Sequence, residues 1–519
     1  MNRRQFFRAS TGALAFPALL RSPLALPQVS HGIQIGDPLA DRAIVWARAD
    51  RPSRMIVDYA ATENFSDARR ISGPVVDPVS GLTGRVDLKN LKAGQTFFVR
   101  VSFEDRDGNT LSEPALGRFR TAPAGGRDIR FLWSGDTVGQ GYGINPALGG
   151  MRIYETMRRL EPDFFIHSGD TIYADNPVPA EIRLADGTLW KNLTTEAKSK
   201  VAETLDEFRG NYLYNLMDDN VRRFNASVPQ IWQWDDHDVC DNWSPGKNLQ
   251  DNAAYKVKDI GVLVQRARQA FLEYAPMRFE SHHPRIYRRI SYGPLLDVFM
   301  LDLRSYRAAN NFNRQESESA ETTYFGAEQL NWLRHDLKNS RAIWKVMASD
   351  MPLGIIVGDG EDAQKRPRYE NSSNGDGPPL GRELEVARLL GFMRENHVRN
   401  VVWLTADVHY TAAHFYDPSK AQFTNFDPFW EFVSGPLNAI TVGPNALDNT
   451  FGIQVAYQKA PAGANPDRSP RAGMQFFGEV FIEAPTRALT VNLRDLSGGI
   501  LFSKTLEAVI QSRVAAKQF

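Results

Sequence analysis

The segment Asp163-Phe-Phe-Ile-His-Ser-Gly-Asp-Thr-Ile-Tyr-Ala-Asp175 has the pattern of a buried strand that ends in a polar turn. Its apolar run, Phe164 to Ile166, predicts the strand, and Gly169 predicts the turn. The carboxylate of Asp170 follows at once, and the phenol of Tyr173 comes three positions later. Ligands collect at the carboxyl ends of strands in open α/β sheets, because loops there carry side chains on a rigid floor.

Five other apolar runs share this design of a short strand followed by an acidic residue. The six runs are Ile129 to Trp133, Phe164 to Ile166, Gln230 to Trp234, Leu295 to Leu301, Ile343 to Ala348 and Val401 to Leu404. The acids at their ends are Asp136, Asp170, Asp235, Asp236, Asp302, Asp350 and Asp407. One strand ending in aspartate indicates only a turn. Six of them predict a functional rim on a sheet.

Helical spacing of apolar residues alternates with these runs, which is the pattern of an α/β fold. The predicted helices are Ile153 to Leu160, Glu203 to Phe224, Val262 to Tyr274, Ala327 to Leu337 and Arg382 to Glu395. A polar, Gly- and Pro-rich segment from Gly358 to Gly381 predicts a long surface loop, and such loops are often lids. After Phe426 the chain returns to strands, which we expect to form a second sheet layer.

The N-terminal part has a different pattern of apolar and turn residues. Short strands separated by turn residues predict a small all-β, Ig- or fibronectin-like sandwich over residues 31–122. A Gly- and Pro-containing linker follows, and the catalytic domain is expected over residues 127–519. Lys plus Arg equal Asp plus Glu at 61 each, so bulk charge argues against nucleic-acid binding. The single cysteine, Cys240, excludes an intrachain disulfide.

Residues 1–30 have the composition of an export signal. Arg3 and Arg4 precede a short apolar stretch, Thr11 to Leu20, which is far below the roughly 20 residues that span a bilayer. The paired arginines resemble a twin-arginine signal, and a frayed basic tail is the alternative. The signal predicts the twin-arginine machinery as a partner, a periplasmic or secreted location, and no transmembrane anchor after its removal.

Converging carboxylates without basic residues among them repel one another, and multivalent cations commonly relieve this repulsion. Asp170 is a candidate bridging ligand, flanked by Asp136 and Asp407. A Tyr173 phenolate would favour ferric iron; an ordinary half-buried tyrosine is the alternative. His409 follows Asp407 at the second position, so an extended backbone places both side chains on one face.

The block Trp234-Asp-Asp-His-Asp-Val-Cys-Asp-Asn-Trp243 surrounds one histidine with four acids. Asp236 or Asn242 is expected to supply an oxygen ligand to a second ion, and the choice between them is open. His237 is a candidate proton donor held by a carboxylate and a candidate contact to substrate. A calcium loop is the alternative interpretation of this acidic turn.

In combination these motifs resemble the alkaline phosphatase D (PhoD-like) family of the calcineurin-like metallophosphatase superfamily. The resemblance covers nearly the whole chain. It rests on Asp136, Gly169-Asp-Thr-Ile-Tyr173, Asp235-Asp-His-Asp238, Leu301-Asp-Leu-Arg-Ser-Tyr-Arg307, Asp407-Val-His409 and Glu431-Phe-Val-Ser-Gly-Pro-Leu437. It implies a four-layer α/β/β/α sandwich with a two-metal centre, preceded by the small β domain. Some members carry cysteine where this chain has Asp136, so hard cations become the expected metals.

The resemblance also implies a function and a ligand set. Asp136, Asp170, Tyr173 and Asp407 would hold one ion, Fe³⁺, and Asp170 would bridge to Ca²⁺ or another divalent ion (Mg, Mn or Zn) supported by His409. The expected activity is hydrolysis of small phosphate mono- or diesters by a metal-bridging hydroxide, with Asp170 and His237 as the catalytic residues.

Arg304, Arg382, His237 and Asn242 are candidate substrate contacts, and structural pairing is the alternative for both arginines. Two other functions remain open. One is an exported, non-catalytic protein that binds metal or phosphate compounds. The other is phospholipase- or phosphotriesterase-like hydrolysis on the same centre.

Overall fold

Two large β-sheets form the centre of the molecule in a computed structural model. The structure describes residues 26–108, 110–280, 282–464 and 466–510. The paired arginines and the apolar stretch of the predicted export signal lie outside the described residues. None of the helices in the described part of the chain has the length and apolar character that a membrane crossing requires.

The first sheet has nine strands, and three of the predicted runs form its parallel centre. In spatial order its strands are β24 (Ile500–Leu506), β23 (Leu489–Asp495), β22 (Phe476–Ile482), β8 (Ile129–Ser134), β9 (Phe164–Ser168), β12 (Gln230–Gln233), β1 (Val29–Gly36), β2 (Ala43–Ala49) and β5 (Thr83–Leu88). β8, β9 and β12 run parallel to one another. Their carboxyl ends therefore lie at one edge of the sheet.

The second sheet has seven strands, and the other three predicted runs lie side by side in it. Its order is β13 (Arg288–Ser291), β14 (Leu296–Met300), β15 (Trp344–Ala348), β18 (Val401–Thr405), β20 (Phe429–Val433), β19 (Thr411–Tyr416) and β21 (Ile453–Lys459). β14, β15, β18 and β20 are parallel.

Alternate residues of the central strands face different layers. In β8, Phe131 and Trp133 belong to the apolar cluster between the sheets, whereas Leu132 belongs to the cluster under the helices. In β15, Val346 and Ala348 face the first sheet and Met347 faces the opposite way. Both faces are buried, which explains why these strands read as continuous apolar runs.

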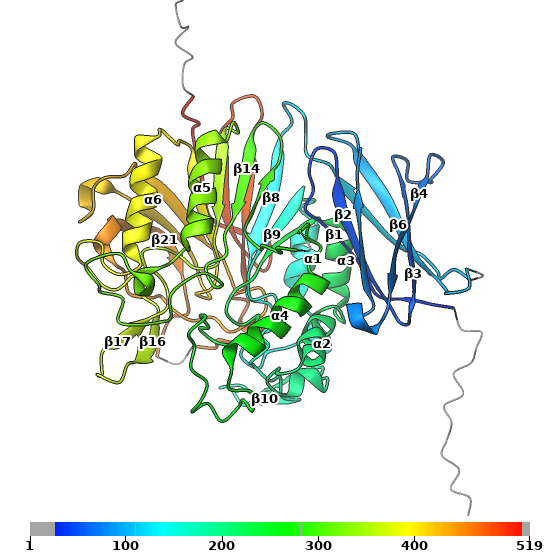
Figure 1. Cartoon of the computed structure of the whole chain (residues 1–519), viewed down its shortest axis with the longest axis horizontal. Coiled ribbons are helices and arrows are strands. Elements are labelled where there is room, and N and C mark those ends of the chain that lie inside the picture. The colour runs from blue at the N-terminus through cyan, green and yellow to red at the C-terminus, as the bar shows by residue number, and fades with distance from the viewer. Residues whose placement is uncertain (1–25, 109, 281, 465, 511–519) are drawn as a thin grey trace, which may run out of the picture.

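Helices cover the outer face of each sheet. The helices are α1 (Arg152–Arg158), α2 (Leu205–Asn215), α3 (Asp219–Ser227), α4 (Ile260–Tyr274), α5 (Ala327–Asn339) and α6 (Glu383–Glu395). Buried residues of α1 to α4 share one core cluster with the first sheet, and those of α5 and α6 share another with the second. In Figure 1 the two groups of helices lie apart from each other. This arrangement is the expected four-layer α/β/β/α sandwich.

The N-terminal strands form a small all-β sandwich. Its second sheet is β4 (Arg69–Val76), β3 (Ser53–Ala60), β6 (Thr96–Glu104) and β7 (Ala115–Arg120), packed on β1, β2 and β5 through a shared apolar cluster. Three strands facing four is an Ig- or fibronectin-like arrangement. β1 also pairs with β12 at Gly36 and Gln230, so one sheet runs from the sandwich into the α/β body.

Three local predictions differ from the structure. The helix predicted over Glu203 to Phe224 is two helices, because Asp218 caps α3 by accepting from the N–H groups of Asn220 and Val221. The predicted loop contains a hairpin, β16 (Gly358–Glu361) and β17 (Pro367–Tyr369). β22 and β23 extend the first sheet beside β8, where we expected a second layer.

The remaining elements are short. They are the hairpin strands β10 (Glu181–Arg183) and β11 (Leu189–Lys191), and the 3-10 helices η1 (Pro78–Ser80), η2 (Pro146–Leu148), η3 (Ala197–Ser199), η4 (Ala320–Thr322), η5 (Pro418–Lys420), η6 (Asn449–Phe451) and η7 (Pro470–Ala472).

Candidate metal centre

The ends of four central strands bring carboxylates from both sheets to one place. Asp136 follows β8, Asp170 follows β9, Asp236 follows β12 and Asp407 follows β18. Three sets of side chains here have ligand atoms within 4.8 Å of one another. The sets are Asp136, Asp170 and His409; Asp170, Asp236 and His237; and Asp235, Asp236 and Asp407. Asp170 is common to the first two sets, as a bridging ligand would be.

Several of these residues have a left-handed backbone. The φ angles are 67° at Asp136, 49° at Asp170, 65° at Asp407 and 58° at His409. Non-glycine residues rarely adopt positive φ, and such positions cost on the order of 1–3 kcal/mol and cluster at functional sites. The turns after the strands therefore hold these side chains in orientations that an ordinary loop would not adopt.

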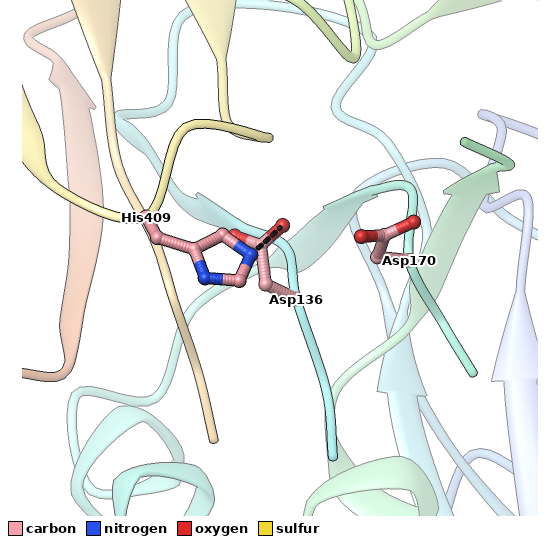
Figure 2. Close-up of side chains that lie close together, drawn as sticks. All are labelled: Asp136, Asp170 and His409. Atoms are coloured by element: carbon pink, nitrogen blue, oxygen red, sulfur yellow. Dashed lines mark ion pairs between the residues drawn. The ribbon is translucent and has the colours of Figure 1, made fainter. Parts of the chain in front are cut away.

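The carboxylate of Asp136 is buried without a hydrogen-bond partner. The residue is 1% exposed, and neither oxygen accepts a hydrogen bond. Figure 2 shows its oxygen beside the His409 ring, where Oδ1 lies 3.6 Å from Nε2. Burial and the charge of Asp236 raise the pKa of Asp136 well above its ordinary value. A buried carboxylate in this state fits a site that a cation completes.

Asp170 lies between the two sets that share it. Its Oδ1 accepts a hydrogen bond from the main-chain N–H of His237 at 3.0 Å. Burial, followed by the charge of Asp236, raises the pKa of Asp170 well above its ordinary value. One protein hydrogen bond does not satisfy a buried carboxylate, so oxygen lone pairs remain for other ligands.

His409 has a fixed tautomer. Its Nδ1 lies 2.6 Å from the carbonyl oxygen of Ile440, which only accepts, so Nδ1 carries the proton. Nε2 is therefore an acceptor, and the Tyr173 hydroxyl donates to it at 2.7 Å. Burial lowers the pKa of His409 to about 4. A neutral imidazole whose Nε2 carries a lone pair is the form that binds metals.

The two residues of the Asp407-Val-His409 motif occupy exchanged positions relative to our expectation. We expected Asp407 beside Asp136 and His409 at the second ion. Instead His409 groups with Asp136, whereas Asp407 groups with Asp236. The reason is local, because a positive φ at both residues breaks the extended backbone that would have put them on one face.

Of the two candidate ligands in the Trp234–Trp243 block, Asp236 reaches the centre and Asn242 does not. Asp236 lies within ligand distance of Asp170 and His237. It also accepts from the main-chain N–H of Asn242 at 2.6 Å. The Asn242 amide lies instead between the carboxylates of Asp359, at 3.3 Å, and Glu370. Burial alone would raise the pKa of Asp236, but the charges of His237 and Arg304 hold it below its ordinary range.

His237 is held by a carboxylate that sequence reasoning did not identify. Its Nδ1 lies 2.8 Å from Oδ1 of Asp175, and its ring stacks on Tyr173 with centroids 4.3 Å apart. Nε2 lies 3.7 Å from Oδ2 of Asp236. Burial would lower the pKa of His237, but the carboxylates of Asp175, Asp236 and Asp170 raise it well above its ordinary value. The presence of Asp175 in the Gly-Asp-Thr-Ile-Tyr-Ala-Asp motif was the available signal.

Arg382, a candidate substrate contact, makes structural contacts within the chain. It is fully buried, and most of its donors bind main-chain carbonyl oxygens on two loops. Those of Tyr369, Glu370, Asn371 and Ala309 lie at 2.8–3.2 Å. Its guanidinium therefore fastens the loop after the β16–β17 hairpin to the loop after β14.

Arg304 is also fully buried, and carboxylates surround it. It contacts Asp235, Asp236, Asp350, Asp407 and Glu370. Glu370 comes from the segment that we predicted to be a surface loop. These contacts and its complete burial favour the structural-pairing alternative for Arg304.

Asp302 stands apart from the candidate ligands. It accepts from the Trp234 indole N–H at 3.0 Å and from the main-chain N–H of Ser305 at 2.9 Å. Its role is to hold the turn after β14, so this strand end does not contribute a carboxylate to the centre.

Comparisons with known proteins agree with this architecture. Residues 131–493 match the model of the PhoD-like phosphatase family, and residues 15–123 match the model of the PhoD-like phosphatase N-terminal domain. Alkaline phosphatase D of Bacillus subtilis (strain 168) is 27% identical over 399 residues, which are 73% of this chain. The match spans 64% of that relative's length.

Solved structures show the same fold. The structure of PhoD superposes with a TM-score of 0.67 at 21% identity, covering 92% of this chain and 89% of that chain. The purple acid phosphatase PPD1 from yellow lupin (Lupinus luteus) seeds superposes with a TM-score of 0.55 at 11% identity, covering 93% and 74%. With the family match extending over most of the sequence, the chain belongs to the PhoD-like phosphatase family.

Proposed function

We propose that the protein is an exported, metal-dependent phosphoesterase that hydrolyses small phosphate mono- or diesters. The observation that carries the proposal is the pair of adjacent ligand sets joined by Asp170, the first of which contains the buried, unpartnered carboxylate of Asp136. The family match and the B. subtilis relative, which is named an alkaline phosphatase, support the same class of reaction.

The residues present fit two cations. Asp136, Asp170, Tyr173 and His409 would hold the first, and Asp170, Asp236 and Asp407 the second. The donors are oxygens except for one imidazole, which suits hard cations; ferric iron with calcium, magnesium, manganese or zinc is the proposed pair. When bound, the ions would supply a water acidified for attack and positive charge against the phosphate oxygens.

The chain's own residues supply orientation and a proton. Asp175 binds Nδ1 of His237, which leaves Nε2 to point toward Asp236. The Asp175 carboxylate stabilises a charged imidazole, so His237 is placed to donate from Nε2 to phosphate or to the leaving oxygen. The Tyr173 ring fixes the imidazole plane by stacking. Asn242 is held by carboxylates, so we assign it a positioning role.

The test is turnover of a panel of substrates by metal-loaded and chelator-treated protein. A chromogenic monoester, a diester, a phosphotriester and a phospholipid separate phosphatase from phosphotriesterase- and phospholipase-like activity. Chelator-sensitive turnover of the mono- or diester supports the proposal. Tight metal or phosphate binding without turnover of any ester would leave the non-catalytic binding protein as the function.

Export and domain organisation belong to the same proposal. Residues 1–30 would direct folded protein through the twin-arginine machinery, residues 31–122 would form the N-terminal domain, and residues 127–519 would carry catalysis. Cell fractionation tests the route. Replacing Arg3 and Arg4 by lysine should leave the protein in the cytoplasm, whereas unchanged export would contradict it.

A further inference from the structure

Two buried carboxyl groups hold the segment that precedes α6. Glu383 is the first residue of α6, and Asp448 caps η6. Glu383 is 0% exposed and Asp448 is 1% exposed. Their side chains lie within hydrogen-bonding reach of each other. Two buried carboxylates at this separation would repel each other strongly, so the pair requires a positive charge, a metal ion or a proton, between them.

Both carboxyl groups bind the same asparagine, Asn374. Oδ2 of Asp448 accepts from the main-chain N–H of Asn374 at 2.9 Å and from that of the next residue at 2.8 Å. Oε2 of Glu383 accepts from the Asn374 side-chain amide at 2.9 Å and from the main-chain N–H of Leu380 at 3.2 Å. The two acids therefore fasten both ends of residues 374–381, which contain no helix or strand.

The hydrogen bonds distinguish the two acids. Asp448 also accepts from the main-chain N–H of Thr450 at 2.9 Å, so three main-chain N–H groups stabilise its negative charge. Oε1 of Glu383 is buried and accepts no hydrogen bond. A carboxyl oxygen in this situation is suited to carry a proton and to act as a donor. In agreement, burial and the charge of Asp448 raise the pKa of Glu383 to about 9.

The other charged groups on the neighbouring elements have partners of their own. The guanidinium of Arg382 binds main-chain carbonyl oxygens at 2.9 and 3.0 Å. Asp376 accepts from a main-chain N–H at 2.8 Å, and Glu385 accepts from two main-chain N–H groups at 2.8 and 3.1 Å. A proton is therefore the positive charge that we assign to the pair.

We propose that Glu383 donates a proton to Asp448 and that this shared proton latches residues 374–381 in place. Loss of the proton to solvent at alkaline pH leaves two carboxylates in contact, and their repulsion loosens the segment. The segment follows Glu370, which contacts Arg304 beside the candidate metal ligands, so its release reaches the surroundings of the centre. The latch does not depend on ester hydrolysis.

The direction of the pH dependence follows from the two states of the segment. In the open state Glu383 is exposed to water and titrates near its ordinary value of 4.5, whereas in the latched state it keeps its proton up to about pH 9. The latch is therefore strongest below the ordinary value and weakens as pH rises toward 9. Its opening constant can increase by up to about tenfold for each pH unit in that window.

The experiment measures hydrogen exchange by mass spectrometry in metal-loaded protein between pH 6 and pH 9. Protection of residues 374–381, corrected for the intrinsic exchange rate, should fall with pH in wild type by up to about tenfold per unit. Glu383→Gln has the shape of the protonated acid and donates at every pH. The variant should be at least as protected as wild type at pH 6 and should keep that protection at pH 9.

Two further variants separate the latch from a general effect of removing a buried acid. Glu385→Gln is the matched control, since Glu385 is buried on the same helix but accepts from the main-chain N–H groups of Tyr324 and Phe325. It should retain the pH dependence of wild type. Asp448→Asn removes the neighbouring negative charge, so it should reduce the pH dependence.

Constant protection of residues 374–381 in wild type from pH 6 to pH 9, or an equal fall in Glu383→Gln, would overturn the proposal. An unfolded Glu383→Gln would also overturn it, because the site must accept a neutral side chain of this shape. Added calcium that restores protection at pH 9 in wild type but not in Glu383→Gln would assign the pair to a metal ion instead. Each of these results leaves the proposed phosphoesterase function intact.

Discussion

Oδ1 of Asp175 lies 2.8 Å from Nδ1 of His237, and Oδ2 of the same carboxylate accepts from the main-chain N–H of Asp241 at 2.8 Å. One carboxylate thus fixes both the histidine ring and the turn that follows it. The two residues are separated by 62 positions in sequence. Their contact joins the loop after β9 to the loop after β12.

This contact predicts the behaviour of Asp175→Asn. The amide can no longer stabilise a charged imidazole, so kcat should fall by about ten- to hundredfold, less than the ~10²–10⁴ expected for loss of a general acid. KM should change little. The loss should be greater for an alkyl phosphate than for a nitrophenyl phosphate, because only the poor leaving group needs a proton. Equal losses on both esters would contradict a role in proton donation.

Gly435→Ala should disturb the first ligand set without unfolding the protein. A Cβ at this position would lie 2.1 Å from Oδ2 of Asp136, too close for the carboxylate to stay in place. We expect weaker metal binding and at least tenfold lower activity, measured by metal titration and ester turnover. Gly126→Ala is the control, since a Cβ there meets nothing within 4 Å. Unchanged metal affinity in Gly435→Ala would show that Asp136 is not a ligand.

Chelation should destabilise the protein more at alkaline than at acidic pH. Burial raises the pKa of Asp136 and Asp170 in the folded, metal-free chain, so that state binds more protons than the unfolded chain. The contribution of these two groups to the stability of the metal-free folded state is therefore fully present below the ordinary carboxyl pKa of about 4, and it declines as pH rises above that value. Bound cations would replace these protons. Melting temperatures at pH 5 and pH 8, with and without chelator, check this; a pH-independent effect of chelator would contradict it.

Lys198→Met should change the pH dependence of stability. Lys198 is buried and donates to the carbonyl oxygen of Tyr173, and burial lowers its pKa to about 7. Folding therefore disfavours the charged form, so the destabilisation is complete below pH 7 and disappears as pH rises toward the unfolded value of 10.5. The free energy of unfolding of the variant minus that of wild type should therefore be more favourable to the variant at pH 6 than at pH 9, by a few kcal/mol at most. Urea unfolding at both values measures the difference, and equal differences would refute the assignment.

Much of this centre could be predicted because each acid follows its strand directly in the sequence. The positions of Asp136, Asp170, Asp236 and Asp407 follow from where apolar runs end, and parallel strands bring such ends to one edge. The pairing of these acids into sets could not be predicted, because it depends on left-handed backbone angles at the acids and at His409. The sequence does not show which residues take those angles, since aspartate and histidine adopt positive φ more often than most residues but still in only a small fraction of cases.

Long-range contacts explain the other failures. β22 and β23 have ordinary strand patterns, and only tertiary pairing with β8 places them in the first sheet. Glu370 lies in a polar segment without periodicity, yet the charge of Arg304 draws it into the core. The break between α2 and α3 could have been predicted, because the aspartate at position 218 is a favourable N-cap for a new helix.

The most direct test of the central claim combines metal content and turnover in wild type and Asp170→Asn. Asp170 belongs to both ligand sets, and asparagine keeps its size while removing the charge. Wild type should contain two ions per chain and hydrolyse a chromogenic phosphate ester, whereas the variant should remain folded, lose at least one ion and lose activity by about a thousandfold or more. Full activity in Asp170→Asn, or in wild-type protein shown to be free of metal, would contradict the account.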